Sequence, residues 1–248
     1  MGGDGFLYFV LAFAGLLGSV LLYNQNQLLE KQNEKIDNQI ELEESSRRGN
    51  LIVMMSNIMD KVDEELEKDW NKDSIRNLSP QLLGRIIALS LSFKPYRFWH
   101  NGKLIEKPLS PEKGQLLVAL LNSKLDYHTN QSIFRKGNFE NSYLENAVFP
   151  DFNLMYINLQ NSYMAKTTIG NTMLSFANLS NVDLRHSTFF KGDISSANIE
   201  GIKVSNKTWI ENLNYSATGG FEDIVEKWVV DTTLKKDLYG DYYTIKKR

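Results

Sequence analysis

The sequence predicts a mainly β fold, a solenoid of stacked coils. A transmembrane helix, a helical stalk and a small helical unit precede the solenoid, and a C-terminal helix caps it. Three observations carry this prediction: an uncharged apolar stretch near the N-terminus, helix-type apolar spacing after it, and large apolar residues at every fifth position further on. With 42% hydrophobic and 23% charged residues, the chain of 248 residues has the composition of a folded protein, which excludes wholesale disorder.

Charge and residue types exclude several classes of function. A formal net charge of −2 provides no global attraction for nucleic acid, so no nucleic-acid partner is expected. The absence of cysteine excludes disulfides, thiolate metal sites and cysteine nucleophiles. The three histidines lie far apart, and no glycine-rich phosphate loop is present. We therefore predict a protein that is not an enzyme, with no catalytic, cofactor-binding or metal site.

Residues 6–23 form the predicted transmembrane helix, after an N-terminal tail at residues 1–5. These eighteen residues carry no charge, and as a helix they rise about 27 Å, close to the thickness of the hydrocarbon core. No positive charge precedes the stretch and no small-residue cleavage site follows it, which favours an uncleaved anchor over a signal peptide. The alternative is a buried helix of a soluble protein. Because Lys31 and Lys35 follow the stretch and no base precedes it, the bulk of a single-pass inner-membrane protein is expected in the cytoplasm.

Small residues in the predicted anchor favour self-association. They lie on one stripe of the helix at Ala14, Gly15, Gly18 and Ser19. Such residues let two membrane helices approach closely, so a homo-oligomer is expected. A monomeric anchor is the alternative, because this spacing is common in membrane helices.

Residues 24–72 are predicted to form the helical stalk. Leu22, Leu29 and Ile36 recur at heptad spacing, with asparagine at the intervening seam positions. This pattern fits a short parallel coiled coil or a single amphipathic helix. A break is expected at residues 47–50, before a second amphipathic run.

Residues 73–129 are predicted to form a small helical unit that contains a hairpin. Ser79 and Ser110 each precede a proline and an apolar run, a pattern typical of a helix N-terminus. The two helices are expected to pack as a pair. Between them, Asn101 and Gly102 separate two short apolar segments, which predicts a tight hairpin turn.

Residues 130–212 contain the five-residue period. Its large apolar positions are Phe134, Phe139, Leu144, Phe149, Leu154, Leu159, Met164, Ile169, Leu174, Leu179, Leu184, Phe189, Ile194, Ile199, Val204 and Trp209. A period of five keeps one face buried neither in a simple strand nor in a simple helix. The chain must therefore turn at each repeat, as in a solenoid.

A second period of twenty residues predicts four pentads per coil. One series of asparagines consists of Asn138, Asn158, Asn178 and Asn198, and a second of Asn141, Asn161 and Asn181. Identical amides that stack between successive coils form ladders. Val148, Thr168 and Thr188 form a compatible β-branched column.

Several segments carry a resemblance to a known family. Residues 147–149, 177–181 and 197–201 read Ala-Val-Phe, Ala-Asn-Leu-Ser-Asn and Ala-Asn-Ile-Glu-Gly, and they resemble the units of the pentapeptide-repeat family. The resemblance implies a right-handed quadrilateral β-helix in which the large residue and a small residue two positions earlier point inward. Bulky or charged residues replace the small residue at Phe152, Ile157, Ile202 and Lys207, and local distortion is expected at the first two.

Residues 213–248 are predicted to form a C-terminal capping helix and a basic tail. Residues 221–230 have amphipathic spacing suited to a helix, and the lysines after Leu234 suggest a solvated tail. The helical unit before Ser132 is expected to cover the other end of the solenoid.

The function predicted from these features is a non-catalytic, membrane-anchored scaffold or interaction protein that presents the β-helix to an unknown protein partner. The partner-binding candidates are Met155, Tyr156, Met173 and Phe176, four outward residues in adjacent coils. Another segment of the same chain covering them is the alternative. DNA mimicry directed at a topoisomerase, known among pentapeptide-repeat proteins, is disfavoured because residues 130–210 carry seven bases and six acids. A further alternative is an accessory subunit of a membrane enzyme or channel.

Overall fold

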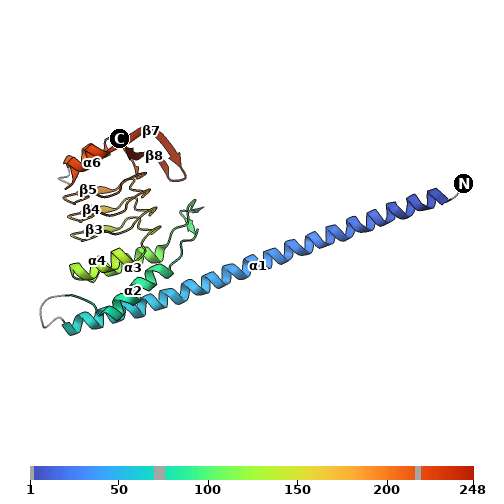
Figure 1. Ribbon diagram of the computed structural model, residues 1–248, viewed down its shortest axis with the longest axis horizontal. Coiled ribbons are helices and arrows are strands. Elements are labelled where there is room, and N and C mark those ends of the chain that lie inside the picture. The colour runs from blue at the N-terminus through green and yellow to red at the C-terminus, as the bar shows by residue number, and fades with distance from the viewer. Residues whose placement is uncertain (1–2, 70–75, 216–218) are drawn as a thin grey trace. The chain divides into compact units, whose positions relative to one another are not determined.

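The computed structural model describes residues 3–69, 76–215 and 219–248 (Figure 1). The chain divides into two compact units, one up to Asn50 and one from Leu51 to Arg248. Each unit is considered by itself.

Helix α1 (Gly3–Asp69) is continuous, so the predicted break at residues 47–50 is wrong. Gly49 is exposed inside this helix, where glycine costs only about 1 kcal/mol relative to alanine. This cost is too small to interrupt a long helix. Arg47 Nη2 also contacts Glu44 Oε2 at 2.7 Å, an i,i+3 ion pair that supports the helix at this place.

The apolar residues at heptad spacing in the N-terminal part of α1 are exposed in the single chain. Leu22, Leu29 and Ile36 are each more than half exposed, and the coiled coil stays a prediction. Within the part of the chain that the structure describes, no helical run is long and apolar enough to cross a membrane. The transmembrane helix predicted for residues 6–23 is therefore not supported, although α1 includes these residues as helix.

The second unit begins with the last part of α1, which contributes Ile58, Val62 and Leu66 to the hydrophobic core. Helix α2 (Pro80–Ser92) packs nearby, and its N-cap Ser79 accepts a hydrogen bond from the Leu82 N–H. The Ser79 backbone N–H in turn donates to Glu65 of α1 at 2.8 Å. The cap satisfies an N–H group that has no partner inside the helix. The bond to Glu65 joins the start of α2 to α1.

The predicted hairpin and second helix are also present. Strands β1 (Trp99–His100) and β2 (Lys103–Leu104) pair antiparallel around a turn with positive φ at Asn101 and Gly102, as a tight hairpin turn requires. Helix α3 (Pro111–Asn122) begins after N-cap Ser110.

Helix α4 (Tyr127–Lys136) was not predicted. It crosses the expected boundary between the helical unit and the repeats at residue 129, and it replaces the first pentad. Phe134 is nevertheless buried, as the five-residue period predicts. Asp126 caps this helix by accepting hydrogen bonds from two backbone N–H groups, those of His128 and Thr129. Helix α2 packs against α4, an arrangement that the expected pairing of the two other helices did not include.

Coils of twenty residues stack in parallel between residues 137 and 206, and we call this region the coil stack. On one side, β3 (Val148–Pro150), β4 (Thr168–Gly170) and β5 (Thr188–Phe190) pair parallel in the register expected from the β-branched column (Figure 1). The other sides are joined by single parallel bridges at the same interval. The solenoid prediction is thus confirmed in part: the chain forms short strands in small sheets rather than a closed, continuous solenoid.

A left-handed residue at each corner turns the chain. Positive φ recurs at every fifth residue, at Asn141, Asn146, Asp151, Tyr156, Asn161, Lys166, Asn171, Phe176, Asn181, His186, Lys191 and Ser196. Asparagine tolerates this conformation better than most residues. The second asparagine series therefore serves the corners rather than a ladder.

The first asparagine series does form an amide ladder over most of its length. Asn198 Nδ2 donates to Asn178 Oδ1 at 3.2 Å, and Asn178 Nδ2 donates to Asn158 Oδ1 at 3.0 Å. The ladder ends before Asn138, whose Oδ1 accepts from Lys113 Nζ at 2.9 Å.

The bulky replacements do not interrupt the stacking. Ile157 and Ile202 are fully buried, and the Met173 N–H still donates to the Phe152 carbonyl at 2.9 Å. The expected distortion at Phe152 and Ile157 is absent from the backbone hydrogen bonds, because larger inward residues alternate with smaller ones in adjacent coils.

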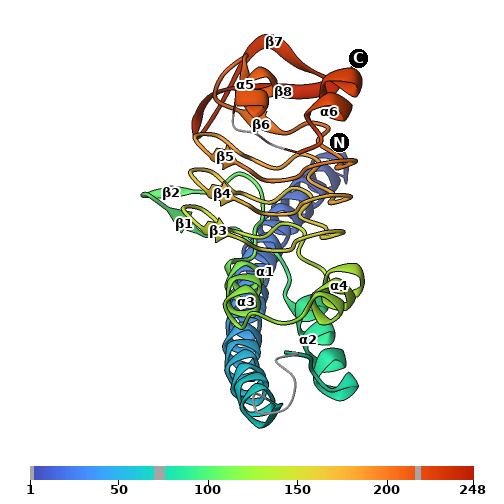
Figure 2. The same cartoon turned by 90° about the vertical axis from the view of Figure 1, so that its left-hand side faces the viewer.

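The C-terminal segment differs from the prediction. It contains α5 (Trp209–Tyr215) and α6 (Phe221–Lys227), and in place of a solvated basic tail it forms strands β7 (Trp228–Asp237) and β8 (Gly240–Lys247). Strand β8 pairs antiparallel with both β7 and β6 (Lys203–Val204), so this hairpin closes the end of the coil stack (Figure 2). At the opposite end, the Ser110 N–H donates to the Asn141 carbonyl at 2.7 Å, as the predicted cover requires.

Candidate interaction face

The four predicted partner-binding residues lie on one side of two adjacent coils. Segments 152–156 and 172–176 are joined by a parallel bridge between Asn153 and Met173. Leu154 and Leu174 point inward and are buried. We call the outward residues Met155, Tyr156, Met173 and Phe176 the aromatic face.

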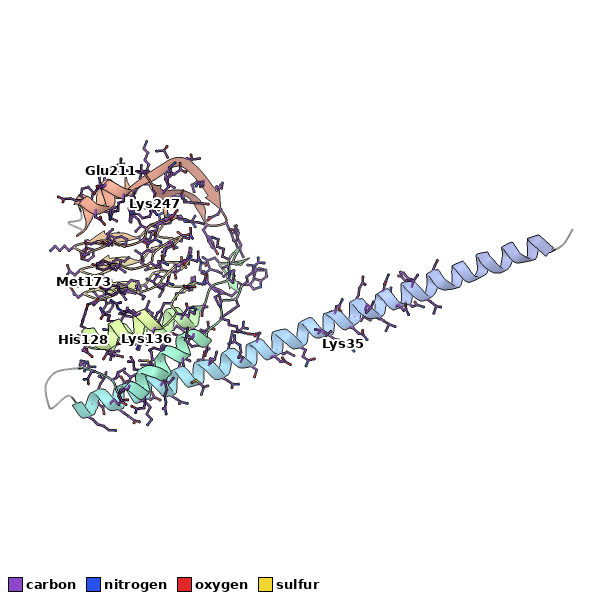
Figure 3. All side chains as sticks on the ribbon, in the orientation of Figure 1. Lys35, His128, Lys136, Met173, Glu211 and Lys247 are labelled. Carbon is purple, nitrogen blue, oxygen red and sulfur yellow. The ribbon has the colours of Figure 1, made fainter. Side chains whose placement is uncertain are left out.

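The aromatic face remains accessible in this structure. Phe176 is 52% exposed and Met173 is 41% exposed, whereas Met155 and Tyr156 are half-buried. Met173, labelled in Figure 3, lies at the side of the coil stack. The four side chains are thus not an interior core of the second unit.

The two aromatic rings form a stack that continues onto α4. The ring centroids of Tyr156 and Phe176 are 5.2 Å apart with an interplanar angle of 9°. Arg135 Cζ lies 3.6 Å from the centroid of the Tyr156 ring, within the range of a cation–π interaction. Arg135 is not among the partner-binding residues predicted from the sequence. A signal was present, because Arg135 stands twenty positions before Met155 in the sequence.

The positions of the two aromatic residues are unfavourable for the backbone. Tyr156 has φ of 67° and Phe176 has φ of 61°, in a region that large side chains rarely adopt. Such a conformation costs about 1–3 kcal/mol per residue. Neighbouring corners of the coil stack carry asparagine, which adopts this conformation more readily. Two corners of the coil stack thus carry large aromatic rings, whereas the other corners carry asparagine, aspartate, lysine, histidine or serine.

A carboxylate borders the aromatic face in the next coil. Asp193 accepts hydrogen bonds from Ser175 Oγ at 2.6 Å and from the Ser195 N–H at 2.9 Å. Burial alone would raise the pKa of Asp193, but the hydrogen bonds from Ser175 and Ser195 hold this pKa below its usual value. The aromatic face therefore lies between a cationic edge at Arg135 and an anionic edge at Asp193.

On another side of the coil stack, a buried charge cluster fixes the C-terminal hairpin. Arg185 is 2% exposed and contacts Asp183 Oδ2 at 2.5 Å and Asp237 Oδ1 at 2.8 Å. Lys203 Nζ also binds Asp237. Burial alone would raise the pKa of Asp237, but the hydrogen bonds from Lys203 and Arg185 lower it. Asp183 is therefore a paired, buried carboxylate, because the hairpin covers this side of the coil stack.

The β1–β2 hairpin is joined to the coil stack by a second polar cluster. Glu145 accepts a hydrogen bond from Tyr143 Oη at 2.6 Å and lies 3.1 Å from His100 Nε2 and 2.9 Å from Lys166 Nζ. Burial acts to raise the pKa of Glu145, but the hydrogen bonds from Tyr143 and Lys166 lower it. Since each member bonds to another, the cluster is a structural junction.

Two other sequence expectations concern metal ions and the anchor. Within the described residues, no group of three or more histidine, aspartate or glutamate side chains could hold a metal ion. The burial of Ala14, Gly15 and Gly18 is not described by the structure, and Ser19 is exposed on α1. Self-association of the anchor therefore stays a prediction.

Part of the coil stack matches a known family of repeats. Residues 153–189 and 171–206 match the sequence model of pentapeptide repeats, in eight copies. The repeats of this chain are similar to pentapeptide repeats. This match supports the resemblance seen in the sequence and covers the aromatic face. A comparison with curated proteins finds no match to the chain.

Proposed function

We propose that the chain is a non-catalytic scaffold whose pentapeptide repeats present the aromatic face to a protein partner. The family match suggests an interaction or scaffold role. The observation that carries the proposal is the stack of the half-buried Tyr156 ring on the exposed Phe176 ring, at two corners with positive φ. Aromatic and arginine side chains contribute most strongly to protein interfaces, and Arg135 stands at the end of this stack.

The opposite charges at the two edges of the aromatic face favour one orientation of a bound partner. An approaching segment with an acidic residue near Arg135 and a basic residue near Asp193 would pair with both edges and cover the rings between them. Such complementary charges fix the register of a complex more than they increase its affinity.

The tether is the second part of the proposal. We infer from the sequence that residues 6–23 anchor the chain in the inner membrane with the coil stack in the cytoplasm. Extraction of membranes with alkaline carbonate tests this part separately. An anchored chain stays in the pellet, and deletion of residues 6–23 moves the chain to the supernatant.

A photo-crosslinking experiment tests the aromatic face. Benzoylphenylalanine is placed at Phe176 and, as a matched control, at Asn181, the next corner of the same coil. In native membranes, irradiation followed by mass spectrometry should identify one discrete protein adduct from position 176 that position 181 does not give. The paired substitution Tyr156→Lys with Phe176→Glu should abolish this interaction. The control pair Asn161→Lys with Asn181→Glu introduces the same charges at the neighbouring corners and should leave the interaction intact. Equal adducts from both positions would contradict the proposal.

A further inference from the structure

The stack of planar side chains on the aromatic face is covered at one end and open at the other. At the α4 end, the guanidinium of Arg135 covers the Tyr156 ring, with Cζ 3.6 Å from the ring centroid. The nearly parallel Tyr156 ring covers one face of Phe176. The next corner in this column is Ser196, and a serine side chain is too short to cover a phenyl ring. Phe176 is accordingly 52% exposed, and in the described part of the chain Tyr156 is the one aromatic ring stacked on it.

A carboxylate stands beside the open end of the stack. In α6, Asp223 Oδ2 accepts a hydrogen bond from the Ser196 N–H at 3.1 Å, so this carboxylate lies at the corner next to Phe176. Asp223 Oδ1 pairs with Lys227, whose side chain is 54% exposed. The hydrogen bond from Lys227 lowers the pKa of Asp223, so the carboxylate is charged at neutral pH. Because so exposed an ion pair is weak, the carboxylate can receive a second cation.

An uncovered ring beside a negative charge favours a planar cation. A guanidinium is flat and weakly hydrated, so it stacks on an aromatic face and donates to a carboxylate at the same time. An ammonium is a compact, strongly hydrated charge without a flat face. A neutral planar group would stack but would gain no ion pair. The covered end of the same stack already holds a guanidinium, because Arg135 lies on Tyr156.

We propose that the open face of Phe176 receives an arginine side chain of the protein partner, whose guanidinium stacks on the ring and pairs with Asp223. Successive coils lie about 4.7–4.9 Å apart, so one planar group occupies the level of the Ser196 corner above the ring. This inference rests on the proposed function, since it names the residue that the partner brings to the aromatic face.

The experiment uses the full chain in detergent, with isotope-labelled methionine methyl groups observed by nuclear magnetic resonance. Met173, labelled in Figure 3, is the reporter on the aromatic face, and Met173→Leu assigns its signal. N-acetyl-L-argininamide should shift this signal saturably, with a Kd in the millimolar range, as for other ligands of this size. N-acetyl-L-lysinamide has the same charge without the planar group, and N-acetyl-L-citrullinamide has a planar group without the charge. Each should bind at least about threefold more weakly.

Two pairs of variants locate the probe. Phe176→Leu removes the ring, and Asp223→Asn removes the charge but keeps an acceptor for the Ser196 N–H. Each should weaken binding of N-acetyl-L-argininamide about threefold. The controls remove the same groups elsewhere, Phe190→Leu at an exposed ring in β5 and Glu222→Gln at an exposed carboxylate of α6. Both should leave the Kd nearly unchanged.

The possible failures of this inference and of the proposed function are distinguishable. No saturable shift of the Met173 signal, equal affinity for the three probes, or an equal loss of affinity in a variant and its control would each overturn the arginine inference. A discrete photo-crosslinked adduct from position 176 together with equal affinity for the three probes would overturn this inference alone. Equal adducts from positions 176 and 181 would overturn the proposed function.

Discussion

Loss of Arg185 tests whether the buried charge cluster holds the C-terminal hairpin on the coil stack. The substitution Arg185→Met removes the guanidinium and keeps much of the side-chain volume. Two carboxylates that are each less than a tenth exposed, those of Asp183 and Asp237, then lose their main partner. Lys203 still reaches Asp237, whereas within the described part of the chain no second base forms an ion pair with Asp183.

The expected cost follows from burial. Breaking a buried ion pair by removing one partner destabilises a protein by about 3–5 kcal/mol, because an uncompensated charge remains. For a unit of about 200 residues, each kcal/mol lowers Tm by about 2–4 °C. The variant should therefore unfold roughly 6–20 °C below the wild type. Adding Asp183→Asn to Arg185→Met should recover part of this loss, because Lys203 still pairs with Asp237 and neither carboxylate position is then left with an unpaired charge.

Thermal and urea unfolding, followed by near-ultraviolet circular dichroism, measure the effect. The control is Lys61→Met, which removes an ion pair with Glu64 whose two side chains are more than half exposed. Such an exposed pair contributes little to stability, because solvent screens it. If Arg185→Met costs no more than this control, the cluster does not hold the hairpin and the reasoning fails.

Three further predictions follow from individual contacts. The pKa of Asp237 is lower in the folded state than in the unfolded state, so the stabilisation from its charged form is present above the unfolded-state pKa and is lost as pH falls through the folded-state pKa. The free energy of unfolding of Asp237→Asn should therefore fall less steeply with decreasing pH than that of the wild type, and an equal slope would contradict this. Gly114→Ala should destabilise the folded chain by about 2 kcal/mol or more in urea unfolding, since the added Cβ would lie 2.1 Å from the Tyr143 carbonyl oxygen. Gly84→Ala, whose added Cβ has no atom within 4 Å, should stabilise the folded chain by about 0.5–1 kcal/mol in the same measurement. Gly15→Leu with Gly18→Leu should convert the detergent-solubilised chain to a monomer in sedimentation, and two identical monomeric profiles would refute anchor self-association.

Local patterns in the sequence predicted most of the coil stack. The five-residue period identified the buried residues, and the twenty-residue asparagine series predicted which coils pair. Helices that begin at Pro80 and Pro111 were also predictable, because a serine cap followed by proline is a short-range signal. The aromatic face followed from the same arithmetic, since residues twenty apart lie in adjacent coils.

Contacts between distant segments could not be predicted in this way. Helix α4 occupies the place of a pentad and packs against α2, which lies more than thirty residues earlier in the sequence. The lysine-rich end of the chain folds as a hairpin because β8 pairs with β6 and Asp237 meets Arg185, fifty-two residues earlier in the sequence. Neither contact leaves a local pattern.

The sequence by itself determined the repeat, its period and its outward aromatic residues, because each depends on spacing along the chain. Tertiary structure decided which side chains cap the ends, which carboxylates are buried, and that Arg135 lies on Tyr156. It also decided that Asp223 lies beside the corner at Ser196. These features depend on desolvation and on atoms brought together in space, which periodicity alone does not describe.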